Sequence, residues 1–167
     1  MGLGISFRMT VVNDEPKQKT YQTIYALPEG QDARFLAAQA MDASRRKQTV
    51  VHIALDDVRV ALLAECLAFF APDVDVLVFP AWDCLPYDRV SPHADIVAQR
   101  VAALSVMLEW AADGLFKPRI VLTSVNAVMQ RVMPPDSLVA AQLVARKGGT
   151  LSLTDLQCFL ANNGYLR

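Results

Sequence analysis

Side chains that could do chemistry gather in a proline-rich stretch between residues 82 and 95. Asp83, Asp88 and Asp95 could hold a metal ion or exchange protons, and Cys84 with His93 could form a nucleophile pair. A cysteine and a histidine that lack a third, orienting group are common by chance. No Cys or His pair has the short spacing of a structural zinc site. The stretch therefore predicts neither a catalytic residue nor a metal ligand.

A structural role accounts for most of the same residues. Ser91 as N-cap, Pro92 at the first helical position and Asp95 in the first turn are typical of a helix start. Arg100 lies further along that helix, where we expect it to pair with one of the aspartates and pin the stretch against the helix. A structural role is favoured over a catalytic one.

A third interpretation of the stretch is an aromatic and basic patch for single-stranded DNA. Bases would stack on Trp82 and Tyr87, and Arg89 and Arg100 would pair with phosphates. The sequence shows no wider basic stripe around this stretch, so this interpretation is the weaker one.

The turn at 26–34 is where a phosphate-binding loop would be expected, after a first strand at 20–26. Such a loop needs glycines, a lysine for the phosphates and a hydroxyl for magnesium. This turn has one glycine and neither of the other two features, and its acidic residues would repel an anion. We interpret it as a degenerate phosphate loop, with no cofactor bound at Pro28, Glu29, Gly30, Gln31 and Asp32.

The elements that must position these residues alternate along the chain. Apolar or β-branched runs predict strands at 20–26, 49–54, 74–79 and 119–123, with helices at 32–45, at 56–70, after Ser91 and at 124–131. For the helix at 56–70 we expect an Asp56 cap and a buried stripe of Val58, Leu62, Cys66 and Phe69. His52, inside an apolar strand, is expected to be a satisfied core histidine. The alternation predicts an α/β fold with a parallel sheet and helices on both faces.

The regular alternation of predicted strands and helices ends after Pro135. Residues 138–145 look extended, and Ser152 with Asp155 forms a capping box before a last helix. We predict a flexible leader at 1–19, an α/β domain at 20–135 and, at 136–167, the truncated start of a second domain too small to hold its own core.

The composition and net charge limit the classes of protein to which the chain can belong. The 167 residues are 53% hydrophobic, which is enough to build a core, and the net charge of -1 gives no global attraction to nucleic acid or to an anionic membrane. Cys66, Cys84 and Cys158 are odd in number and far apart, which favours reduced thiols and a cytoplasmic protein. No apolar run has the roughly 20 residues that span a bilayer, so no membrane partner is expected.

The proline-rich stretch resembles the bacterial transcription-repair coupling factors, the Mfd family, whose amino-terminal region carries a similar W-x-x-L-P-Y-D-x-x-S-P-x-x-D-I-x-x-x-R pattern. Further matches lie at 126–134 and in the last helix, so the similarity covers most of 20–167. The residues of this chain that carry the motif are Trp82, Asp83, Leu85, Pro86, Tyr87, Asp88, Ser91, Pro92, Asp95 and Arg100.

The resemblance implies a helicase-like domain similar to domain 1a of the repair protein UvrB, interrupted by a small domain that docks UvrA. The family's UvrA-contacting residues lie beyond Arg167, so UvrA would bind mainly outside this chain. RNA polymerase and DNA would be bound by other domains of the parent protein. ATP and magnesium are expected only in the parent's motor.

The leading hypothesis is a non-catalytic UvrB-like scaffold in transcription-coupled nucleotide-excision repair. The alternative is an active nucleotide-binding UvrB-like ATPase, and a further possibility is an α/β domain that binds another small ligand beside the 82–93 stretch.

Overall fold

The computed structural model describes residues 23–24, 27–28, 30–84, 91–112, 117–143, 145 and 147–162. The chain divides into two compact units, a first unit at Met1–Gln130 and a second unit at Arg131–Arg167. Of the predicted features, the leader at 1–19 and most of the strand at 20–26 lie outside the described residues, as do Glu29, Leu85, Pro86, Tyr87 and Asp88.

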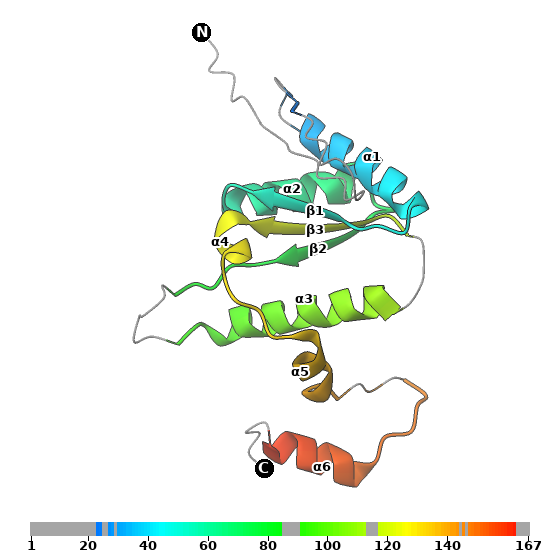
Figure 1. The fold of residues 1–167 in the computed structure, drawn as a ribbon, viewed down its shortest axis with the longest axis vertical. Helices are drawn as coiled ribbons and strands as arrows, with labels where there is room; N and C mark the ends of the chain where they lie inside the picture. The colour runs from blue at the N-terminus through cyan, green and yellow to red at the C-terminus, as the bar shows by residue number, and fades with distance from the viewer. Residues whose placement is uncertain are drawn as a thin grey trace, which may run out of the picture. The chain divides into compact units, whose positions relative to one another are not determined.

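The first unit is built on an open parallel sheet (Figure 1). Its described strands are β1 (Val50–Ala54), β2 (Asp75–Phe79) and β3 (Arg119–Ser124), in the order β1-β3-β2. Val50 pairs with Ile120, and Asp75 pairs with Arg119. The three strands predicted over these residues, and their parallel pairing, are confirmed. Apolar runs identify such strands because both faces of the middle strand are covered.

Helices cover both faces of this sheet (Figure 1). On one face, α1 (Gln31–Arg45) and α2 (Asp57–Phe70) pack Leu36 and Leu63 against Ile120 and Leu122 of β3. Asp56 caps α2 as predicted, since its Oδ1 accepts a 2.8 Å hydrogen bond from the Arg59 amide. These residues form the larger of the two apolar clusters.

The opposite face of the sheet is covered by α3 (Ala94–Ala112). Ala103 of α3 is buried with Phe79 of β2 and Val121 of β3, and Trp110 packs at the edge of this cluster. A short helix, α4 (Val125–Val128), follows β3 directly, and the Ser124 hydroxyl accepts a 3.4 Å hydrogen bond from the Ala127 amide. The predicted Ser124 cap is confirmed, but the helix is shorter than the expected 124–131.

The buried stripe predicted for α2 is wrong at Val58, Leu62 and Phe69, whereas Cys66 is partly buried against the core. Val58 and Phe69 are 80% and 79% exposed, and the buried positions are Val60, Leu63 and Leu67. Because α2 is apolar on several faces, its sequence allows more than one stripe, and the direction of the underlying sheet decides which one is buried.

The second unit contains α5 (Pro135–Ala140) and α6 (Leu153–Asn162). Residues 138–140 are helical, so the extended segment predicted from 138 is wrong at its start. The Ser152 hydroxyl accepts a 3.3 Å hydrogen bond from the Asp155 amide, which is the predicted cap. Across the described residues, no helix is long and apolar enough to cross a membrane.

Candidate functional site

The centre of the motif region is the guanidinium of Arg100. Its side chain lies between two aromatic rings, with Cζ 4.3 Å from the ring centroids of both Phe79 and Trp82. Nη1 donates to the Pro80 carbonyl at 2.5 Å and to Oε1 of Gln130 at 3.2 Å. The residue is 2% exposed. Arg100 therefore joins the end of β2, the helix α3 and the segment after α4.

Of the aspartates predicted to pair with Arg100, neither Asp83 nor Asp95 does so, and Asp88 lies outside the described residues. The faces of the Arg100 guanidinium stack on rings, and its edge donates to neutral oxygens. Burial lowers the pKa of Arg100 from its usual value. That usual value is high enough that the guanidinium stays charged at neutral pH. A planar cation is suited to this arrangement because it can stack and donate at the same time.

Gln130 completes this cluster and was not identified from the sequence as a member. Its Oε1 also accepts a 2.8 Å hydrogen bond from the Trp82 amide. One neutral oxygen thus fixes both the backbone at Trp82 and the side chain of Arg100. Its position within the matched 126–134 segment was the one available signal.

Asp83, His93 and Asp95 organise the start of α3. Both carboxylate oxygens of Asp83 accept a 3.2 Å hydrogen bond from the His93 amide. The Asp95 amide donates to Nδ1 of His93 at 3.4 Å. The helix begins at Ala94, so His93 stands in the N-cap position. The predicted N-cap at Ser91 and helical Pro92 are therefore wrong, whereas Asp95 lies in the first turn as expected.

Among the described residues of this region, the structure forms neither the nucleophile pair nor the metal site that the catalytic interpretations require. Cys84 is half-buried and, within the described segments, makes no hydrogen bond to His93. The same segments contain no group of three or more His, Cys, Asp or Glu side chains that could hold a metal ion. Instead, the Asp83 carboxylate accepts from the His93 amide, and the Asp95 amide donates to the His93 side chain.

The turn before α1 is the second candidate site. Gly30 is its N-cap residue, with φ at 83°, a left-handed conformation that glycine adopts without a steric penalty. Asp32 is 5% exposed, and its Oδ1 accepts a 2.9 Å hydrogen bond from the Ala33 amide. Its Oδ2 forms an ion pair with Nη2 of Arg59 on α2.

This pairing corrects one part of the sequence argument. Asp32 was expected to repel an anion as a bare negative charge, but Arg59 compensates it. The first turn of α1 nevertheless offers little to a phosphate, because the Ala33 amide already donates to Asp32. Neither a lysine nor a hydroxyl stands between Pro28 and Arg34.

His52 of β1 lies near this ion pair. It is buried, as predicted, but it is not satisfied, since its Nε2 has no hydrogen-bond partner within the part of the chain that the structure describes. Burial lowers the pKa of His52 from 6.5, with Asp32 raising it and Arg59 lowering it by smaller amounts. The histidine is therefore held neutral in the folded chain more strongly than in the unfolded chain.

Stability should consequently fall as the pH drops below 6.5. There the unfolded chain gains a proton at His52 that the folded chain does not, and the slope approaches about 1.4 kcal/mol per pH unit for one proton. Urea unfolding between about pH 7.5 and about pH 5.5 measures it. His52→Gln should flatten the slope. A slope in His52→Gln equal to that of the parent chain would contradict this assignment.

The described first unit defines an α/β protein with an open parallel sheet. Comparison with curated proteins then gives its relatives, which are transcription-repair-coupling factors. The chain is 32% identical to the one from Haemophilus influenzae over 124 residues, and 35% identical to that of Escherichia coli over 123 residues. A relative from Rickettsia bellii is 26% identical over 121 residues. The chain is thus homologous to one segment of the transcription-repair-coupling factors.

The similarity covers only a small part of each relative, which limits the properties that can be transferred to this chain. The matches to the first two relatives cover 74% of this chain, and the chain spans about a tenth of their length. No protein-family model matches the chain. No solved structure matches it significantly, so the UvrB-like assignment remains a prediction.

Proposed function

We propose that the chain is a non-catalytic, UvrB-like scaffold module of a transcription-repair-coupling factor. The observation that carries the proposal is its homology to one segment of those proteins, which are named for coupling transcription to repair. In this role the module presents a second, UvrA-docking domain, which begins in the second unit, and packs against the rest of a longer polypeptide in the cytoplasm.

The non-catalytic part of the proposal rests on the turn before α1. A working phosphate loop offers amides, a lysine and a hydroxyl to the nucleotide. Here Asp32 accepts an amide of the first turn and pairs with Arg59, so the polar groups of this turn are used within the protein. ATP and magnesium would act only in the motor of the parent.

The partners follow from the family alone. UvrA would bind mainly through residues beyond this chain, and RNA polymerase and DNA through other domains of the parent. Within this chain, the Arg100 cluster would hold the two ends of the 82–93 stretch, because Trp82 is fixed by Gln130 and Asp83 binds the His93 amide. The motif residues would then be positioning residues.

Calorimetric titration of the chain with ATP and magnesium tests this function. We expect no saturable heat, because the turn supplies no lysine or hydroxyl for the phosphates. A UvrB-type ATPase with an intact phosphate loop, titrated in the same buffer, should give a saturable isotherm and shows that the assay can detect binding. Saturable ATP binding to this chain would overturn the non-catalytic assignment and favour the active ATPase.

A further inference from the structure

The helix α2 carries apolar side chains on the face that it does not bury. One face of α2 packs against the core of the first unit. Val58, Leu62 and Phe69 recur at intervals of four and seven residues, so they share a different face of the helix. All three are exposed. We call these three residues the outer stripe of α2. Exposed apolar surface of this kind is typical of a contact with another molecule.

Two aromatic rings form the carboxyl-terminal end of the outer stripe. The rings of Phe69 and Phe70 pack edge to face, with their centroids 5.0 Å apart, and both residues are exposed. The face of an aromatic ring attracts a cation. The last turn of α2 contains no basic residue, and the carboxyl end of a helix carries about half a negative charge. This end of the outer stripe therefore suits an occupant that brings both a cation and apolar groups.

The charged side chains beside the outer stripe are acidic. Glu65 of α2 and Asp73 just beyond its end are exposed, and Glu65 stands one turn of helix from the stripe. Neither carboxylate forms an ion pair with any residue that the structure describes. Arg59 is the one basic residue of α2, and it is paired with Asp32. An occupant of complementary charge is consequently basic.

Acidic charge beside the outer stripe disfavours other occupants of an exposed apolar face. A second copy of this chain would bring the same carboxylates to the contact, and nucleic acid or an anionic membrane would bring phosphates, so like charges would meet in each case. A partner helix with lysine or arginine beside its apolar side chains has the opposite charge. A helix also matches the shape of the stripe, because ridges of side chains spaced three and four residues apart pack into the grooves of a second helix.

We propose that the outer stripe of α2 docks a basic, amphipathic helix of a partner polypeptide. The apolar side chains of that helix pack along Val58, Leu62 and Phe69, and its cations bind Glu65 and the carboxyl-terminal end of α2. The outer stripe shares no residue with the Arg100 cluster. The proposal goes beyond the scaffold function and does not depend on the loss of the nucleotide site.

Fluorescence anisotropy with labelled helical peptides tests the proposal on the full chain. The probe is a peptide of about 18 residues, long enough to form a helix, with leucines along one face and lysines on both sides of them. A matched probe carries glutamate in place of lysine. We expect saturable binding of the lysine peptide, at least about tenfold tighter than that of the glutamate peptide, that weakens as salt is added. No saturable binding of the lysine peptide, or equal affinity for the glutamate peptide, would overturn the proposal.

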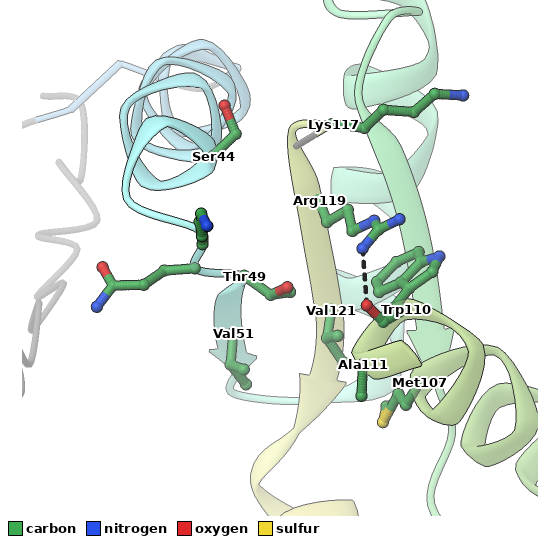
Figure 2. Close-up of a pocket in the computed structure, with 11 residues that line it drawn as sticks. Ser44, Thr49, Val51, Met107, Trp110, Ala111, Lys117, Arg119 and Val121 are labelled. Carbon is green, nitrogen blue, oxygen red and sulfur yellow. Dashed lines mark hydrogen bonds between the residues drawn. The ribbon is translucent and has the colours of Figure 1, made fainter. Parts of the chain in front are cut away.

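Serine substitutions assign the binding to the outer stripe. Val58→Ser and Phe69→Ser should each weaken peptide binding about tenfold, because each removes exposed apolar contact area and leaves the core intact. Val51→Ser is the matched control, since Val51 is an exposed valine that lines a pocket of about 570 Å³ on the other face of the sheet (Figure 2). Equal weakening by Val51→Ser would contradict the assignment to α2.

Charge reversal tests the electrostatic part of the contact. Glu65→Lys should weaken binding of the lysine peptide about tenfold, the ratio that one opposed charge contact can produce. Glu109→Lys is the matched control at an exposed glutamate of α3, on the other face of the sheet, and should change the affinity less than about twofold because salt screens distant charges. The same loss in both variants would mean only an effect of net charge and would sink the proposal.

Two other occupants give distinct results. Self-association of the chain in sedimentation equilibrium that Phe69→Ser abolishes would assign the outer stripe to a second copy and overturn the partner assignment. A rise in peptide affinity in the double variant Phe7→Ser with Met9→Ser would assign it to the amino-terminal segment of this chain, with the same consequence. A chain that stays monomeric, and whose peptide affinity the double variant leaves unchanged, supports the proposal.

Discussion

Replacing Arg100 by leucine is expected to lower the free energy of unfolding of the first unit by about 3 kcal/mol. The substitution removes the stacked cation from between Phe79 and Trp82, and it leaves the Pro80 carbonyl without its donor. Trp82 and Trp110 are the only tryptophans of the chain and both belong to this unit, so tryptophan fluorescence in urea measures its unfolding.

Two variants test whether the stabilisation by Arg100 depends on the shape of its guanidinium or only on its charge. Arg100→Lys keeps the charge but cannot stack on two rings while donating, so it should recover less than half of the loss. Arg46→Leu is the matched control at an exposed arginine in an i,i+4 pair with Asp42, and it should cost under about 0.5 kcal/mol. A loss for Arg100→Leu no larger than that for Arg46→Leu would contradict the central role of Arg100.

The Arg100 cluster shows where sequence reasoning stops. Arg100 was expected to pair with one of the nearby aspartates. Among the described residues, its partners are two rings and two neutral oxygens, one of them from Gln130, 30 residues away along the chain. Neither stacking nor a neutral acceptor leaves a periodic signal in the sequence. The motif could therefore be recognised from its residues, but its contacts could not be derived from them.

The sheet was predictable for the opposite reason. Only β3 is buried at every position, and Val51 and Ile53 of β1 are 60% and 50% exposed. The strands were predictable because each is a continuous apolar run, and the runs at 49–54, 74–79 and 119–123 have no competing interpretation of suitable length. The side of α2 that is buried depends on how the helix lies on the sheet, and an almost entirely apolar helix does not encode that. α3 begins later than predicted, and the amide that donates to the Asp83 carboxylate just before the helix is that of His93, not that of Ser91.

The turn before α1 has one feature that could be predicted from the sequence and one that could not. The absence of a lysine and a hydroxyl is visible in the sequence, so the degenerate phosphate loop could be proposed from it. The partner of Asp32 could not, because Arg59 lies 27 residues away on another helix. This contact changes Asp32 from an exposed repelling charge into half of a buried ion pair, and it makes the turn a determinant of stability.

Replacing Asp32 by alanine should therefore cost about 3 kcal/mol or more, because it leaves the largely buried Arg59 guanidinium without this carboxylate. The loss for Asp32→Ala with Arg59→Met should be smaller than the sum of the two single losses, since the double variant breaks the same ion pair only once. Urea unfolding of the parent chain, both single variants and the double variant gives the coupling energy.

Asp42→Ala at the exposed pair with Arg46 provides the control and should cost under about 0.5 kcal/mol. Additive losses in the double variant would contradict the coupling. A coupled loss would explain why an acidic residue stands in the first turn of α1, since its carboxylate holds α1 and α2 together at the position where a phosphate loop would keep its amides open for a nucleotide.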